Sequence, residues 1–230
     1  KVWQKLKREG YVIARCTVAR LMQKLGIQGV WRGKNKQTTC SRDDQKRAPD
    51  LVKRNFRADQ PNHLWVADFT YIQTNSGWVY TAFMIDVFSR AIVGWKVSTR
   101  MNTDMVLDAL EQALQDRGMP KNVIHHSDRG VQYLSIRYTH RLEAANLRAS
   151  VGTTGDSYDN ALAETVNGLY KTEVIEYLKA DWQGLADVQL ATLNWVDWFN
   201  KKRVHSALGY VSPFEFEAMY YDKINPLGQV

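Results

Sequence analysis

Three runs of β-branched and aromatic residues follow one another between residues 63 and 99. They read LWVADFTYI, SGWVYTAFMID and AIVGWKVST, with turn-forming residues near 75–77 and 89–90. Runs of this composition bounded by Asn, Gly or Ser predict strands, and such short gaps allow only antiparallel neighbours. The chain is therefore expected to build a meander of three antiparallel strands.

Helices and short strands alternate after this meander. A helix is predicted to open at Asn102 or Thr103 and to run through Asp116. The later elements are predicted as a strand in NVIHHS, a helix over 133–145, a strand near 147–151, a helix from about 158 to 178, and two C-terminal helical stretches. This is the element order of a ribonuclease H-like α/β fold, a mixed sheet in which the later strands add in parallel to the meander and helices cover both faces.

Two short helices, ending at Gly10 and Gly26, are predicted before the sheet. The second carries Arg15, Arg20 and Lys24, and two helices joined by a short turn resemble a helix-turn-helix module that binds DNA. A helical hairpin that packs on another part of the protein fits the same pattern. The small helical module therefore has two open interpretations.

Charge is distributed unevenly along the chain. Residues 1–57 contain 16 Lys or Arg and 4 Asp or Glu, a balance of +12, whereas residues 58–230 contain 15 and 20, a balance of −5. A basic arm on a mildly acidic body indicates a polyanion partner such as DNA or RNA, although a basic face can also serve solubility alone. Within the arm, Arg32, Lys34 and Lys36 are further DNA-binding candidates, and 32–57 is expected to follow a phosphate backbone or to be disordered without one.

These patterns divide the chain into four parts. We expect a partial helix-turn-helix-like module at 1–32, a basic linker at 33–60, a ribonuclease H-like catalytic core at 61–180 and a C-terminal helical extension at 181–230. Because the chain starts without Met inside a predicted helix, we expect it to be a fragment of a longer product. No apolar run is long enough to span a bilayer, and the two cysteines lack the spacing of a zinc site.

Three acidic residues stand where catalytic groups are usually placed. Asp68 lies inside an apolar strand, where an acid is costly without a cation, and Asp128 directly follows the strand NVIHHS. If these strands are neighbours and the helix carrying Glu164 packs across them, the three carboxylates converge. Such oxygens suit Mg²⁺ or Mn²⁺, and two ions about 4 Å apart can activate a water or 3′-hydroxyl for phosphodiester chemistry.

Each acid has a plainer interpretation when taken alone. Asp68 could be a salt-bridged strand residue, Asp128 a turn cap and Glu164 an ordinary helix residue. A glycosidase with paired carboxylates explains the acids but leaves the basic arm without a purpose. A ribonuclease of the same fold and a DNA-binding fragment without activity both remain open on these grounds.

Several motifs together resemble one family. WVADFTYI, HHSDRGVQY and GDSYDNALAETVNGLYKTEVI resemble the DDE transposases of bacterial insertion sequences with a retroviral-integrase-like core, and specifically the second-frame product of the third insertion-sequence family. The 35 residues between Asp128 and Glu164, and Lys171 seven residues after Glu164, match its signature. IDVFSRAIVGW and WVDWFNKKRVHSALGYVSPFEFE match as well, so that the resemblance reaches to about Tyr220.

The resemblance implies a metal-dependent polynucleotidyl transferase in which Asp68, Asp128 and Glu164 are catalytic and hold Mg²⁺ or Mn²⁺, as two ions. It would nick the element ends to free a 3′-hydroxyl and then join that hydroxyl to another phosphodiester, with a circular intermediate. Lys171 would contact DNA near the scissile bond, and Asn160 would either orient Glu164 or contact DNA.

The implied partners are double-stranded DNA of the terminal repeats and of the target, further copies of the chain assembled on DNA, and the first-frame product of the element. The implied location is the bacterial cytoplasm, at the nucleoid when the protein is bound to DNA, with no membrane involved.

Overall fold

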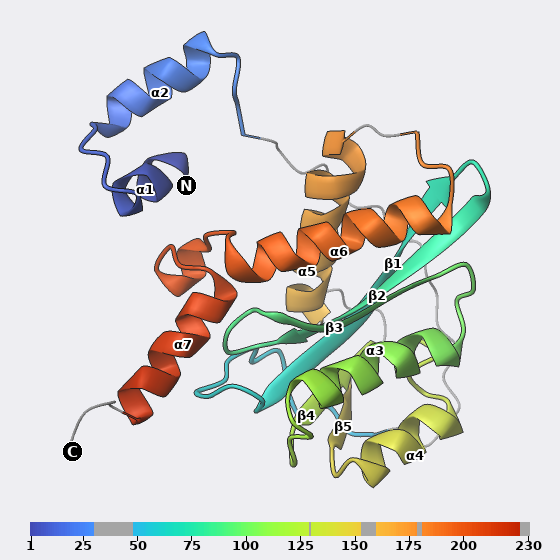
Figure 1. Ribbon diagram of the computed structural model, residues 1–230. Coiled ribbons are helices and arrows are strands. Elements are labelled where there is room, and N and C mark those ends of the chain that lie inside the picture. The colour runs from blue at the N-terminus through green and yellow to red at the C-terminus, as the bar shows by residue number, and fades with distance from the viewer. Residues whose placement is uncertain (30–47, 129, 153–159, 179–180, 226–230) are drawn as a thin grey trace.

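A mixed sheet of five strands in the order β3-β2-β1-β4-β5 forms the centre of the protein (Figure 1). The computed structural model describes residues 1–29, 48–128, 130–152, 160–178 and 181–225. The strands are β1 Leu64–Thr74, β2 Gly77–Asp86, β3 Ile92–Ser98, β4 Ile124–Ser127 and β5 Arg148–Val151. β1, β2 and β3 pair antiparallel, whereas β4 joins β1 in parallel and β5 joins β4 in parallel. The meander and the parallel additions predicted from the sequence are both confirmed.

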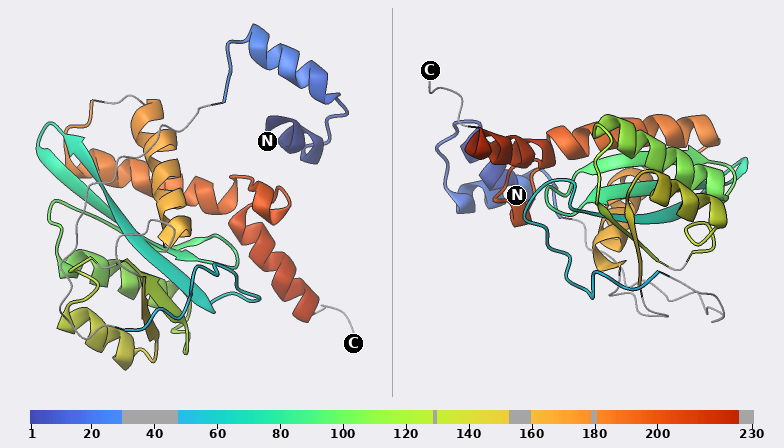
Figure 2. Two further views of the ribbon diagram at one scale, coloured as in Figure 1. Left: turned by 180° about the vertical axis from the view of Figure 1, so that it is seen from behind. Right: turned by 90° about the horizontal axis from the view of Figure 1, so that it is seen from below.

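Helices cover the two faces of this sheet. They are α3 Thr103–Asp116, α4 Ile136–Ala144, α5 Ala161–Tyr170, α6 Leu185–Lys201 and α7 Pro213–Ile224, with a π-helical turn η2 Lys171–Glu176 after α5 and a 3-10 turn η3 Ser206–Leu208 before α7. Figure 2 shows α3 and α5 on opposite sides of the sheet. α4 starts at 136 and not at the expected 133, because the Ser135 side chain caps it by accepting from Tyr138 N.

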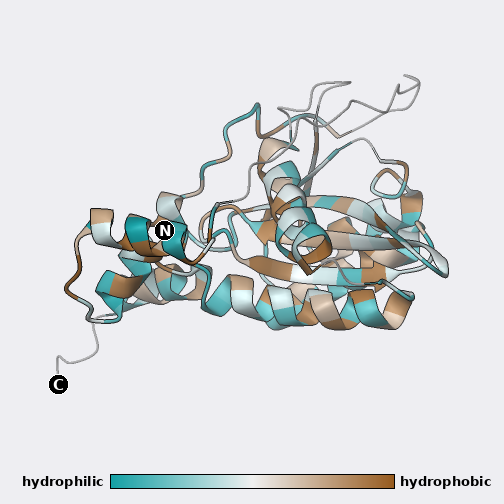
Figure 3. Ribbon diagram, turned by 90° about the horizontal axis from the view of Figure 1, so that it is seen from above, coloured by the Kyte–Doolittle hydropathy of each residue, from teal (hydrophilic) through white to brown (hydrophobic). Residues whose placement is uncertain are grey.

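The strand alternation of β1 divides the core in two. Val66 joins the cluster under α5 and α6, which contains Phe83 and Tyr170, whereas Trp65 joins the cluster under α3 and α4, which contains Leu110. Figure 3 shows many of the hydrophobic residues in the strands, while the helices alternate hydrophobic and hydrophilic residues along their length. A sheet buried on both faces in this way holds the ends of its strands in fixed positions.

The segment just before the sheet belongs to this core. Val52 is only 5% exposed and packs with the α5-side cluster, Phe56 packs against the same cluster, and Leu51 N donates to Ser150 Oγ at 2.9 Å. Part of the stretch expected to be a basic linker therefore packs on the core through these residues. Burial of the apolar side chains of Val52 and Phe56 removes them from water, and the free energy of this transfer favours packing over a solvated, extended segment.

The N-terminal module consists of α1 Val2–Arg8 and α2 Arg15–Lys24 and lies beyond η3 and α7 (Figure 1). Trp3 Nε1 donates to Ile13 O at 2.8 Å, which holds the two helices together, and Arg8 Nη1 donates to Tyr210 O at 2.8 Å. The two predicted helices are confirmed. Among the helices that the structure describes, none combines the length and hydropathy needed to cross a bilayer.

Candidate active site

The register between β1 and β4 places two carboxylates side by side. Parallel pairing runs from Leu64 opposite Ile124 to Ala67 opposite Ser127 and ends there. The next residue on each strand is acidic, Asp68 on β1 and Asp128 after β4. Both acids therefore stand where the two strands separate, at the carboxyl end of the parallel pair, where open sheets commonly place their sites.

Asp68 is the most perturbed of the acids. Burial raises the pKa of its carboxyl well above the ordinary range, and the charges of Asp128 and Glu164 raise it further. Two hydrogen bonds lower this pKa in part, because Oδ1 accepts from Phe69 N at 2.8 Å and Oδ2 accepts from Asn167 Nδ2 at 2.9 Å. A carboxylate with such neighbours is stabilised by a cation.

Asp128 has a turn-forming contact of its own. Its Oδ1 accepts from Gly130 N at 2.9 Å, as expected of a residue that caps a turn. This hydrogen bond involves one of its two carboxylate oxygens. Burial raises the pKa of this carboxyl, and the Gly130 N–H and the nearby His126 lower it in part.

Glu164 reaches the same place from α5. It lies in the first turn of the helix and is exposed, while Ala163, Val166 and Tyr170 anchor the other side of the helix in the core. Burial and the charge of Asp128 raise the pKa of its carboxyl. The three predicted acids are therefore electrostatic neighbours that come from β1, the end of β4 and α5.

The acids are neighbours without forming a closed cluster. Among the residues that the structure describes, no three His, Cys, Asp or Glu side chains stand close enough to hold a metal ion together. Like charges that share a site repel one another, and a divalent cation with its carboxylate ligands offsets that repulsion. The donor set, made only of carboxylate oxygens with raised pKa values, fits Mg²⁺ or Mn²⁺.

Asn167 is a site residue that the sequence analysis missed. It lies on α5 one turn after Glu164, is only 8% exposed, and directs its amide Nδ2 to Asp68. Its Oδ1 is buried and has no hydrogen-bond partner among the described residues. The available signal was the three-residue spacing from Glu164, which places both side chains near one face of the helix.

Asn160 holds the start of α5 against the sheet. Its Nδ2 donates to Ala67 O at 3.0 Å, next to Asp68, and the side chain is 5% exposed. Of the two roles expected for this residue, the contacts favour positioning over contact with DNA. It anchors the helix that carries Glu164.

Lys171 stands at the first position of η2, beside the acids. Its Nζ lies 4.7 Å from the centre of the Tyr71 ring, and burial lowers the pKa of its ammonium group while the charges of Asp68 and Glu176 raise it. Glu173, two residues further along, is engaged elsewhere, because its carboxylate accepts from Arg203 and from Trp195 Nε1. A π-helical turn often marks a functional position in a helix.

The DNA-binding candidates of the arm fall into two groups. Arg15, Arg20 and Lys24 are exposed on α2, as a DNA-contacting helix requires. The other candidates, Arg32, Lys34 and Lys36, lie outside the described residues.

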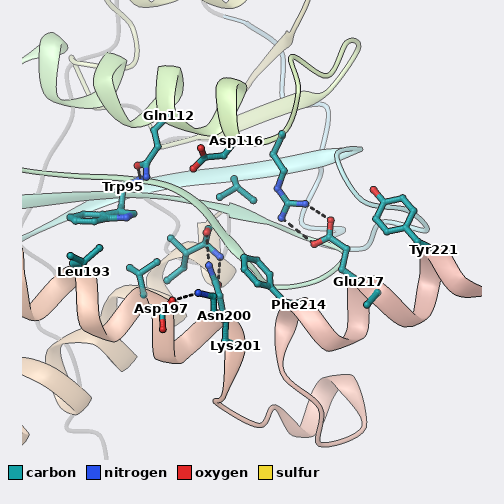
Figure 4. A pocket seen from close by; sticks show the side chains of 15 residues that line it. Trp95, Gln112, Asp116, Leu193, Asp197, Asn200, Lys201, Phe214, Glu217 and Tyr221 are labelled. Atoms are coloured by element: carbon teal, nitrogen blue, oxygen red, sulfur yellow. Dashed lines mark hydrogen bonds and ion pairs between the residues drawn. The ribbon is translucent and has the colours of Figure 1, made fainter.

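A cavity of about 510 Å³ lies elsewhere, between α3, β3, α6 and α7 (Figure 4). Asn200 Oδ1 accepts from Ile92 N at 2.9 Å, and Gln112 Oε1 accepts from Trp95 N at 2.9 Å. These two polar side chains bind backbone groups of Ile92 and Trp95 on the edge strand β3, where such groups could otherwise pair with another strand. The cavity is lined by none of the three acids.

Three family models match most of the chain. Two models described as integrase core domain match residues 58–157 and 145–213, and a model described as HTH-like domain matches residues 1–35.

Solved retroviral integrases share the fold. The HTLV-2 integrase catalytic core domain in complex with magnesium, in its trimeric form, superimposes with a TM-score of 0.55 at 20% identity, covering 70% of this chain and 99% of that one. A chain of the simian T-cell lymphotropic virus intasome, solved in complex with PP2A regulatory subunit B56 gamma, gives a TM-score of 0.61 at 17% identity, covering 79% of this chain and 61% of that one. The ribonuclease H-like fold is confirmed.

Curated relatives are much closer in sequence. The transposase for insertion sequence element IS629 of Shigella sonnei is 56% identical over 97% of this chain and 74% of its own length. The putative transposase for IS986/IS6110 of Mycobacterium tuberculosis H37Rv is 53% identical over 96% and 81%, and transposase InsF for IS3A of Escherichia coli K12 is 34% identical over 94% and 75%.

The fold and the family matches together define a polynucleotidyl transferase of the DDE type with an integrase core. Within that class, the chain belongs to the bacterial insertion-sequence transposases, enzymes of DNA transposition and DNA integration.

Proposed function

We propose that Asp68, Asp128 and Glu164 are the catalytic residues of this transposase and hold its divalent metal. The observation that carries the proposal is the β1–β4 register, which ends at Ala67 and Ser127 and leaves an acid as the next residue of each strand. Burial raises the pKa of all three carboxyls, and the charge of Asp128 raises the pKa values of Asp68 and Glu164 further.

The three carboxylates would hold Mg²⁺ or Mn²⁺, as two ions. When bound, such ions activate the attacking oxygen and stabilise the leaving oxygen of a phosphodiester. In end cleavage, a water oxygen attacks phosphorus and the bond to the 3′-oxygen breaks, which frees a 3′-hydroxyl. In strand transfer, that hydroxyl attacks a second phosphodiester and displaces its 3′-oxygen.

The chain's own groups would position the reactants. Asn167 and Asn160 fix Asp68 and the start of α5, and Lys171 would bind a DNA phosphate beside the scissile bond as a point charge. Phosphate contacts of this kind set the register of DNA without reading its sequence.

The remaining parts would bind DNA and partners. We assign DNA binding to the module at 1–32 and to the basic segment that follows it, catalysis to 61–180 and a packing role to 181–230. The substrates would be double-stranded DNA of the element ends and of the target. Further copies of the chain and the element's first-frame product would complete the assembly.

The test is cleavage and joining of a labelled duplex that carries the element's terminal repeat, in Mg²⁺, in Mn²⁺ and in a chelator. We expect metal-dependent nicks with 3′-hydroxyl ends, followed by joined products. An RNA–DNA hybrid of the same sequence serves as the control for ribonuclease activity. Cleavage of the hybrid alone would reject the proposal.

A further inference from the structure

Two aromatic side chains on the β1–β2 hairpin remain open to solvent. Tyr71 on β1 is 47% exposed and Trp78 on β2 is 50% exposed. Tyr71 pairs with Tyr80 and Trp78 pairs with Gln73 in the antiparallel register, so that both rings lie on the same face of the hairpin. The two rings make an edge-to-face contact, with centroids 5.3 Å apart.

The hairpin that carries these rings is held in place at its tip. Asn75 N donates to Trp182 O at 2.8 Å, Ser76 N donates to Gln183 O at 3.1 Å, and Asn75 Nδ2 donates to Asp181 Oδ1 at 2.8 Å. Figure 1 shows the β1–β2 hairpin extending beyond the rest of the sheet beside the start of α6. The exposed rings therefore stand on an anchored support and not on a free loop.

A cation links the rings to the catalytic acids. Lys171 Nζ lies 4.7 Å from the centre of the Tyr71 ring and interacts electrostatically with Asp68. Tyr71 follows Asp68 by three residues along β1, a separation of about 10 Å at the rise of a strand. Trp78 stands opposite Gln73, five residues after Asp68, which is about 17 Å at the same rise. With one phosphate per about 3.4 Å of axis on each strand of duplex DNA, this distance corresponds to about five nucleotides.

We propose that Trp78, supported by Tyr71, stacks on a base of the DNA substrate that has left the duplex a few nucleotides from the scissile phosphate. The inference rests on the function proposed above and adds a subsite to it. Bases in an intact duplex cover one another's faces, so that an exposed ring can stack only on an unpaired base. An aromatic face beside a phosphate-binding cation is the usual composition of a single-strand site.

The experiment is a thermodynamic cycle between the indole and the base. Affinity is measured by fluorescence anisotropy, without divalent ions, for a duplex of the terminal repeat and for duplexes that carry one abasic position at each nucleotide around the cleavage point. The proteins are wild type, Trp78→Leu, which keeps apolar bulk without a π-face, and Trp78→Phe, which keeps a ring.

At one abasic position we expect a coupling between Trp78 and the base of about five- to 100-fold in affinity, the range of a base–aromatic stack. Compared with wild type, Trp78→Leu should bind the intact duplex more weakly by this factor and should bind the abasic duplex equally well. The effects of removing two groups that contact each other do not add. Trp78→Phe should recover most of the loss. Tyr221→Ala, which removes a ring of similar exposure on α7, is the matched control and should bind like wild type.

The proposal would be overturned if the affinity losses from Trp78→Leu and from removal of the base add at every position. Circular dichroism must show that Trp78→Leu is folded. A change of oligomeric state in Trp78→Leu on sedimentation would overturn it in favour of a protein interface. The binding cycle needs no divalent metal, so its outcome is independent of cleavage. A wild-type protein that shows the coupling but does not cleave the duplex in Mg²⁺ or Mn²⁺ would reject the catalytic assignment and not the stacking site.

Discussion

Asn167 on α5 donates a hydrogen bond of 2.9 Å from its Nδ2 to Oδ2 of Asp68 on β1. This bond crosses from the helix that carries Glu164 to the strand that carries Asp68. It fixes the Asp68 carboxylate and lowers its pKa against the effect of burial. Asn167 thus acts through Asp68 and is a positioning residue.

Replacing Asn167 by Ala should slow end cleavage and joining by about 10- to 100-fold, the usual cost of losing a group that orients a metal-binding carboxylate. The matched control is Asn194→Ala, since Asn194 is exposed on α6. Titration of cleavage against Mn²⁺ checks the mechanism, because the variant should need more metal for half-maximal rate. An unchanged metal requirement would limit Asn167 to a packing role.

The three acids should behave as one unit. Asp68→Asn, Asp128→Asn and Glu164→Gln each keep the side-chain volume and remove one negative ligand, so that each should reduce cleavage and joining by about 10³-fold or more. A double substitution should cost little beyond a single one. A binding titration run in parallel should show DNA affinity at least as high as that of wild type, because a carboxylate repels phosphate. Near-normal joining by any variant would remove that residue from the catalytic set.

Asp68→Asn should also change how stability depends on pH in the presence of a chelator. A carboxyl whose pKa is raised by folding holds its proton more tightly in the folded state, so that wild type loses stability as pH rises from about 4 through that higher pKa. The variant escapes this loss, and rotation of the Asn167 amide would let its unpartnered Oδ1 accept from the new side chain. The variant should therefore melt at a higher temperature than wild type at pH 8 and show no such advantage at pH 3. A parallel decline of both proteins would contradict this account.

The basic arm should supply affinity and not chemistry. Deletion must stop at residue 47, because Val52 and Phe56 pack in the core. The shortened protein should keep its melting temperature within a few degrees and lose DNA affinity. The logarithm of its binding constant should fall less steeply with the logarithm of salt concentration, because fewer counterions are released. The expectation fails if the salt slope of the two proteins is the same.

Lys171→Ala should leave the fold nearly intact, since the residue is only half-buried and its contact is one cation–π pair with Tyr71. It should weaken binding of the cleavage-point phosphate and slow strand transfer. Lys202→Ala is the control, because Lys202 is exposed just after the end of α6. Wild-type rates in Lys171→Ala would return this lysine to an ordinary surface role.

Local patterns in the sequence predicted the elements of the core well. The meander, the later strands and the helix opening at Asn102 follow from periodicity and capping, which depend on residues close together in the chain. The position of Asp128 at a strand end was readable for the same reason. The packing of residues 48–57 was not, because charged residues dominate their composition and conceal two apolar anchors, Val52 and Phe56.

The sequence by itself determined the order of the elements, the basic arm and the three acids with their family spacing. Only the tertiary structure decided that β1 and β4 end their pairing at Ala67 and Ser127, that Asn167 reaches Asp68, and that Trp78 stays exposed on an anchored hairpin. The physical reason is the range of the interactions. Periodicity is set by neighbours along the chain, whereas strand register and the contacts between a helix and a strand depend on how distant segments pack together.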